Sequence, residues 1–135
     1  MGEHLKLAGE WNTVSQTNVE EMLYKIGAPF LIRKAAGHVK PSQSISFEGD
    51  KMKIITVTVK TTEKFIPLDG SEFSDQVFSK TYVCKVTVSE DGSITADGLL
   101  GDMGMKSVRK IDDAGQMVLT TWIDGVECVR VFARK

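Results

Sequence analysis

The chain has 135 residues, of which 41% are hydrophobic and 26% charged, and its formal net charge is −1. This is the composition of an ordinary globular domain, and the near-neutral charge argues against nucleic-acid binding. No apolar run approaches the roughly 18 residues of a membrane-spanning helix. With only Cys84 and Cys128 available, a disulfide framework is not expected. We therefore expect a single domain over residues 1–135 in a reducing, cytoplasmic setting.

One early block of the sequence carries a clear helical pattern. Apolar residues recur at helical spacing from Val19 to Ile26, and Asn18 is expected to cap this first helix. A second short helix is expected to begin at Pro29 and to stop at Gly37. In outline this is a helix-turn-helix. The second helix reads PFLIRKAA, however, and lacks the polar base-reading residues of a DNA-binding version.

The rest of the sequence consists of short alternating runs separated by turn signals such as Asp69-Gly70. Because no helical pattern recurs between these runs, parallel β-α-β units are excluded and antiparallel hairpins are expected. The expected strands lie near residues 6–15, 40–47, 51–60, 62–67, 71–77, 80–89, 93–99, 104–111, 116–123 and 126–134. The sequence thus predicts an all-β fold, a ten-stranded antiparallel up-and-down β-barrel (β-clam) with a helix-turn-helix lid between the first two strands. Closure would remove the exposed sheet edges and enclose a ligand cavity.

The final strand raises a question about Arg130. This residue lies between Val129 and Val131 and shares its strand face with Cys128 and Phe132. If the valines are buried, Arg130 faces water. If Arg130 points inward, its buried guanidinium needs an anionic partner. Strand alternation alone leaves both orientations open.

Four segments resemble the intracellular lipid-binding proteins, the family of fatty-acid-binding and cellular retinoid-binding proteins. GEW at residues 9–11 resembles the opening strand, and NVEEMLYKIG at residues 18–27 resembles the first lid helix. Residues 32–41 resemble the second helix and its exit, and VRVF at residues 129–132 resembles the closing strand. The resemblance covers about residues 8–135. It implies a monomeric carrier of the cytoplasm, and also of the nucleus, that encloses a long-chain fatty acid or a similar hydrophobic carboxylate without a cofactor.

The same resemblance assigns Arg130 to the barrel interior. In this family the last strand directs an arginine at the ligand carboxylate, a tyrosine follows two residues later, and a second inward arginine comes from an earlier strand. Arg130 and Arg109 match the arginines, and Phe132 stands at the tyrosine position. Choosing Lys110 as the second inward residue would also turn Lys106 inward, which is less favourable. Since phenylalanine lacks the hydroxyl, the head-group site is expected to be weaker, more dependent on water, or suited to another ligand.

The remaining site residues follow from matched position and strand parity. The expected cavity lining is Val19, Leu23, Ala36, Pro41, Ile55, Val57, Phe78, Leu119 and Thr121. The expected portal is Phe30, Ile32, Val59, Lys60 and Ser79. The basic side chains of Lys25, Arg33 and Lys34 either only solvate the helical surface or make transient contact with anionic membranes.

Two alternatives to a fatty-acid carrier stay open. The spacing of the two arginines also suits a retinoid carrier, and Phe132 suggests a ligand-free barrel that acts as a protein-interaction module. No catalytic residue and no metal site are expected, because the only histidines, His4 and His38, lie in settings without a nucleophile or further ligands. Trp11 is expected to plug the barrel floor, and Trp122 to point outward or lie at a seam.

Overall fold

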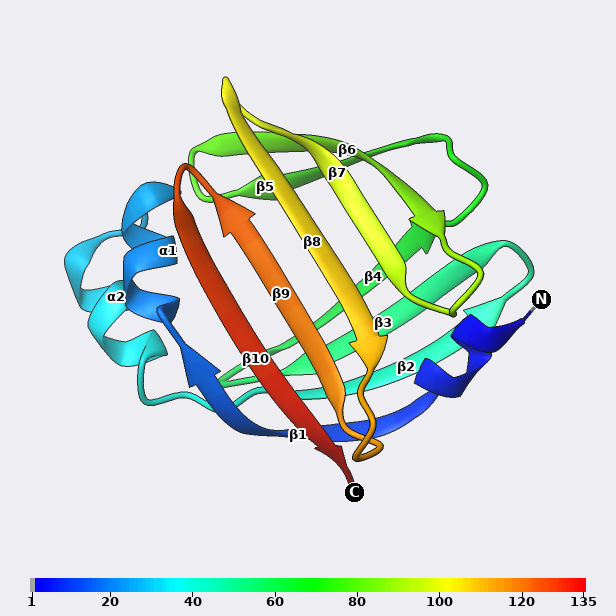
Figure 1. Cartoon of the computed structure of the whole chain (residues 1–135). Helices are drawn as coiled ribbons and strands as arrows, with labels where there is room; N and C mark the ends of the chain where they lie inside the picture. Colours follow the sequence, from blue (N-terminus) through cyan, green and yellow to red (C-terminus); the bar gives the residue numbers. More distant parts are fainter. Residues whose placement is uncertain (1) are drawn as a thin grey trace.

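The computed structural model describes residues 2–135, which form one ten-stranded antiparallel sheet rolled into a nearly closed barrel (Figure 1). The strands are β1 (Gly9–Thr17), β2 (Ser42–Glu48), β3 (Lys51–Val57), β4 (Thr61–Pro67), β5 (Glu72–Val77), β6 (Lys80–Val88), β7 (Ile94–Leu100), β8 (Met103–Ile111), β9 (Met117–Ile123) and β10 (Val126–Arg134). The helices are a 3-10 helix η1 (Glu3–Leu7), α1 (Val19–Lys25) and α2 (Phe30–Ala36). The predicted barrel and its lid between the first two strands are confirmed.

The opening strand begins later than the sequence pattern indicated. The expected strand began near residue 6, but Glu3–Leu7 form η1 and β1 begins at Gly9. The chain turns there at a φ of 133°, and Arg134 lies so close that an added Cβ would meet its guanidinium. Both features favour glycine.

The sheet order runs β4-β3-β2-β1-β10-β9-β8-β7-β6-β5, so β4 and β5 are its two edges. These edges face each other without pairing, and we call the gap between them the β4–β5 seam. Lys64 of β4 and Asp75 of β5 form an ion pair across it. Strands β4 and β5 share no ladder of backbone hydrogen bonds, and this ion pair connects them instead.

The two lid helices are attached to the barrel to very different extents. Val19 and Met22 bury the inner face of α1, whereas none of the residues Phe30–Ala36 of α2 is buried. The expected side-chain cap by Asn18 is not formed, and the Nδ2 of this residue donates to the Glu127 carbonyl oxygen at 2.8 Å. This bond fastens the start of α1 to β10. In the described part of the chain, neither helix has the length and hydrophobicity needed to cross a bilayer.

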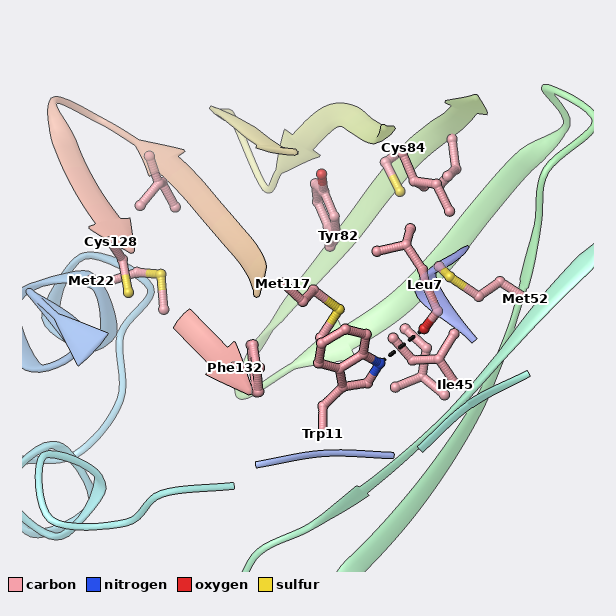
Figure 2. Packing of buried hydrophobic residues seen from close by; sticks show 14 of the residues in the cluster. Leu7, Trp11, Met22, Ile45, Met52, Tyr82, Cys84, Met117, Cys128 and Phe132 are labelled. Atoms are coloured by element: carbon pink, nitrogen blue, oxygen red, sulfur yellow. Dashed lines mark hydrogen bonds between the residues drawn. The ribbon is translucent and has the colours of Figure 1, made fainter. Parts of the chain in front are cut away.

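Helix η1 lies at the end of the barrel away from α1 and α2 (Figure 1), and we call this end the floor. Trp11 is fully buried, and its Nε1 donates to the Leu7 carbonyl oxygen at 2.9 Å (Figure 2). The Arg134 guanidinium lies over the Trp11 indole ring, 4.2 Å from its centroid. Trp11 is therefore a floor plug, as predicted. Trp122 is 38% exposed, and its Nε1 donates to the Glu127 carboxylate, so its predicted outward orientation is confirmed.

The predicted inward face of β3 is wrong. Ile55 and Val57 were expected inside, but Met52 and Ile54 are the buried residues, and Val57 is 44% exposed. Ile54 is the register partner of buried Ile45 on β2, which fixes the inner face. The outer face that carries Ile55 and Val57 also carries the charged side chains of Lys51 and Lys53.

The two tryptophans offer a matched test of the floor. Trp11→Phe should lower the free energy of unfolding by about 1–3 kcal/mol, because it leaves the Leu7 carbonyl without its donor and a void in the core. Trp122→Phe, which removes an indole donor at a partly exposed position, should change stability by about 0.5 kcal/mol or less. Urea denaturation of both variants measures the difference. Equal losses would mean that the floor is no more important than the surface.

Candidate functional site

The barrel places two arginines in one row across three strands. Arg130 on β10 pairs with Leu119 on β9, and Leu119 pairs with Arg109 on β8. Residues in direct register share a face of the sheet. Cys128 and Phe132, which flank Arg130 on the same strand face, are both buried. Arg130 therefore points into the barrel, and the valines between these residues point outward.

Both guanidinium groups point into the barrel, where Arg109 is buried and Arg130 is half-buried. Arg109 is only 7% exposed, and burial, followed by the charge of Arg130, lowers its pKa to about 10. Burial also lowers the pKa of Arg130. Among residues 2–135, neither arginine forms a salt bridge, and the Nε of Arg130 is buried without a hydrogen-bond acceptor. The interior thus holds two like charges with no protein anion between them, an arrangement that favours a bound anion.

Gln43 is a member of this site that the sequence analysis missed. Arg109 crosses the barrel from β8, and its Nη1 donates to Gln43 Oε1 on β2 at 2.7 Å and to Met117 Sδ at 3.6 Å. The amide nitrogen of Gln43 donates in turn to Thr56 Oγ1 at 3.4 Å. Gln43 is buried and lies two positions before buried Ile45. Inward parity on β2 was the signal that could have identified it.

Phe132 contributes a hydrophobic surface where the family resemblance leads one to expect a hydroxyl. Its ring is fully buried, as is its register partner Met117, and both belong to the core cluster that contains Trp11 (Figure 2). Phe132 offers no polar group to the site, and the neutral polar group that contacts Arg109 is the amide of Gln43 on the facing side of the barrel. This site therefore combines two guanidinium groups with an amide.

The barrel has one small pocket beside Arg109 and a larger groove at the lid, which none of these site side chains lines. An enclosed pocket of about 60 Å³ is lined by Met52, Ile54, Ile66, Val86, Ile94, Ala96, Ser107, Arg109 and Leu119. A larger groove of about 740 Å³ lies where α1 and α2 meet the end of β1 and the start of β10, and it includes Gln16, Val19, Arg33 and Val126. Pockets that enclose small-molecule ligands usually measure about 300–1,000 Å³. A long ligand beside Arg109 therefore requires the interior to expand.

The other predicted site residues fall into two groups. Val19, Pro41 and Thr121 are buried, Leu23, Ala36 and Leu119 are partly buried against the core, and Leu119 lines the enclosed pocket. Phe78 lies on the exposed β5–β6 turn rather than on an inward strand face. The predicted portal residues Phe30, Ile32, Val59, Lys60 and Ser79 are all exposed. They lie on α2 and on the β3–β4 and β5–β6 turns.

The other candidate chemistry of the chain is weak. Within residues 2–135, no group of three or more His, Cys, Asp or Glu side chains is placed to hold a metal ion. Both cysteines are free and buried, and burial raises the pKa of the Cys84 and Cys128 thiols, which makes them poor nucleophiles.

Comparison with known proteins agrees with this geometry. The family model described as Lipocalin / cytosolic fatty-acid binding protein family matches residues 8–134. The chain belongs to this family. Human cellular retinoic acid-binding protein 2 is 34% identical over 136 residues, covering 95% of this chain and 97% of the relative. A fatty acid-binding protein of Lepidoglyphus destructor is 30% identical, with 95% and 97% covered. The solved structure of the REP1-NXSQ fatty acid transporter superposes with a TM-score of 0.85 at 26% identity, covering 96% of each chain.

The role of Gln43 in this family member can be tested without a ligand. Gln43→Leu should lower the free energy of unfolding by about 1–3 kcal/mol, because the Arg109 guanidinium loses its buried acceptor. Gln116→Leu, on the β8–β9 turn, is the matched control, since the Gln116 side chain makes no hydrogen bond among the described residues. Thermal and urea unfolding compare the two. A loss no larger than that of the control would show that Gln43 does not hold Arg109.

Proposed function

We propose that this protein is a non-catalytic, monomeric carrier that encloses a long-chain fatty acid or a similar hydrophobic carboxylate, in the cytoplasm and also in the nucleus. The observation that supports the proposal most strongly is the pair of inward-facing guanidinium groups, of buried Arg109 and half-buried Arg130, without a carboxylate partner in residues 2–135. A ligand carboxylate between them would accept charge-assisted hydrogen bonds and relieve their repulsion.

The acyl tail and the carboxylate head group of a fatty acid should contribute very different amounts to the free energy of binding. Burying one CH₂ group contributes about 0.8 kcal/mol, so a sixteen-carbon tail contributes on the order of 10 kcal/mol. A hydrogen bond to a charged group contributes only about 1.5–3 kcal/mol. Micromolar affinity requires about −8 kcal/mol, which the tail can provide after ordering costs. The tail therefore supplies most of the affinity, and the arginines set the orientation and the preference for an acid over an alcohol.

A retinoid with a carboxylate group, such as retinoic acid, is the second candidate ligand. The 34% identity to cellular retinoic acid-binding protein 2 favours it, and its carboxylate would meet the same arginines. Competition between oleate and retinoic acid for a fluorescent fatty acid ranks the two ligand classes. If neither ligand displaces the probe, and native mass spectrometry finds no co-purified lipid, the protein-interaction module is favoured instead.

Selectivity for the head group tests the carrier proposal. Arg130→Gln should weaken oleate much more than oleyl alcohol, and it should leave the fold intact or slightly more stable by relieving the repulsion with Arg109. Phe132→Tyr should tighten oleate binding by about 0.5–3 kcal/mol if the added hydroxyl reaches the carboxylate. Calorimetry with both ligands on the three proteins measures these effects. Equal losses for acid and alcohol in Arg130→Gln would show that the arginine does not recognise the carboxylate.

We also propose that the lid surface makes transient contact with anionic membranes. Leu31 and Val59 are 78% and 95% exposed, and Phe30, which precedes Leu31 in α2, is also exposed. The Arg33 guanidinium and the Lys34 ammonium both lie over the Phe30 ring, at 5.4 and 5.5 Å from its centroid. Apolar side chains with adjacent cations suit an interface of acyl chains and anionic head groups. Lys25 is paired with Asp124 at 3.2 Å and Lys34 with Glu20 at 2.7 Å, so among the described residues Arg33 is the one of these three cations outside a salt bridge.

Vesicle binding tests this contact with a matched pair of variants. Leu31→Asp should weaken binding to phosphatidylserine-containing vesicles, because it places a negative charge in the proposed contact surface. Leu99→Asp makes the same change at an exposed apolar position of β7, outside the two lid helices, and should leave binding near the unmodified level. Co-sedimentation measures both. Equal effects, or equal binding to purely neutral vesicles, would contradict a lid-specific anionic contact.

A further inference from the structure

The lid helix α2 has few attachments to the barrel. Its polar side chains mostly contact the helical region itself. Lys34 pairs with Glu20 of α1 at 2.7 Å, and Arg33 donates to the Ala28 carbonyl oxygen, between the two helices, at 3.0 Å. With no residue of Phe30–Ala36 buried, apolar packing holds it weakly. Segments of this kind open locally at low free energy.

One strand side chain reaches the end of this helix. Gln16 of β1 donates through Nε2 to the carbonyl oxygens of Ala36, at 3.4 Å, and of Val39, at 2.9 Å. These carbonyls belong to the last residue of α2 and to its exit segment. Among the described residues, these are the only side-chain hydrogen bonds that connect a barrel strand with residues 30–39.

A β-bulge directs Gln16 into this position. Trp11 and Thr13 face inward, and regular alternation would turn Gln16 outward. The register shifts between Thr13 and Ser15, so Gln16 becomes the direct partner of Arg130 on β10 and shares its inward face. The same side chain therefore adjoins both the lid and the head-group site.

The unused atoms of the two partners are complementary. Because Gln16 Nε2 is committed to two carbonyls, Oε1 points away from them, and it is buried without a donor. Arg130 Nε is a buried donor without an acceptor. A water molecule can donate to the first atom and accept from the second, and a ligand carboxylate can accept from the second directly.

We propose that Gln16 is a latch that holds the C-terminal end of α2 on the barrel and that couples the position of this helix to occupation of the site at Arg130. Breaking the two Nε2 hydrogen bonds releases α2 while α1 stays fastened by its buried residues and by the bond from Asn18 to Glu127. The holding role is a property of the free protein, and the coupling role rests on the proposed function.

Hydrogen exchange in the full chain without ligand tests the holding role. Gln16→Met keeps the side-chain length but removes the donors, and it should speed exchange of the His38 and Val39 amides, which close the end of α2, by about tenfold. Exchange of the Met22 and Ile26 amides in α1 should stay unchanged. The control Ser15→Met, at the neighbouring exposed position of β1, should alter neither group. Unchanged exchange at the end of α2, or an equal rise in both helices, would overturn the latch.

Oleate tests the coupling role. In the unmodified protein, bound oleate should slow exchange at the end of α2, and in Gln16→Met this protection should be lost. The association and dissociation rates should rise together in Gln16→Met, with a much smaller change in affinity. Equal protection in both proteins, or unchanged rates, would overturn the coupling while leaving the carrier function standing. Failure of every lipid to bind would instead contradict the proposed function, and the exchange result on the free protein would still decide the holding role.

Discussion

The burial of Arg109 within the electric field of Arg130 is the interaction on which the interior of this barrel depends. Desolvation opposes each charge, each charge opposes the other, and the part of the chain that the structure describes provides no carboxylate to offset either. The fold responds with a neutral group, since Gln43 on the opposite wall accepts a hydrogen bond from Arg109. An amide satisfies the geometry of a guanidinium but leaves its charge in place. The Arg109 guanidinium consequently has a hydrogen-bond acceptor in Gln43, but neither arginine has an opposite charge beside it among the described residues.

The two ends of the barrel are built for opposite tasks. At the floor, Trp11 is enclosed by packing, by a hydrogen bond to Leu7 and by the guanidinium of Arg134. At the lid, α1 is fixed by buried side chains, whereas α2 lies on α1 with an exposed apolar surface. The helix with the fewer attachments is therefore at one end only. Arg109 and Arg130 lie between the two ends, so displacement of α2 need not disturb the floor.

Much of the fold could be predicted because turns and alternation are local signals. The paired arginines were also within reach, because their parity follows once the last strand is aligned with the family. Three features were not. Ile55 and Val57 are apolar yet face outward, since pairing of β3 with β2 fixes the inner face. Gln43 was overlooked because a polar residue on a barrel strand is ordinarily assigned to the outside. Gln16 depends on a bulge, which changes the parity of β1 without any sign in the hydrophobic pattern.

The β4–β5 seam gives the barrel a direction in which it can stretch. Separating any other pair of neighbouring strands breaks a ladder of backbone hydrogen bonds, whereas widening the seam separates Lys64 from Asp75, side chains that keep contact with water. The wall is therefore stiff around most of its circumference and compliant along one line. An enclosed pocket as small as the one beside Arg109 can then grow by a hinge-like movement of two edges, with the rest of the sheet keeping its register. Among the neighbouring strands of the barrel, β4 and β5 are thus the pair that can separate without loss of backbone hydrogen bonds between them.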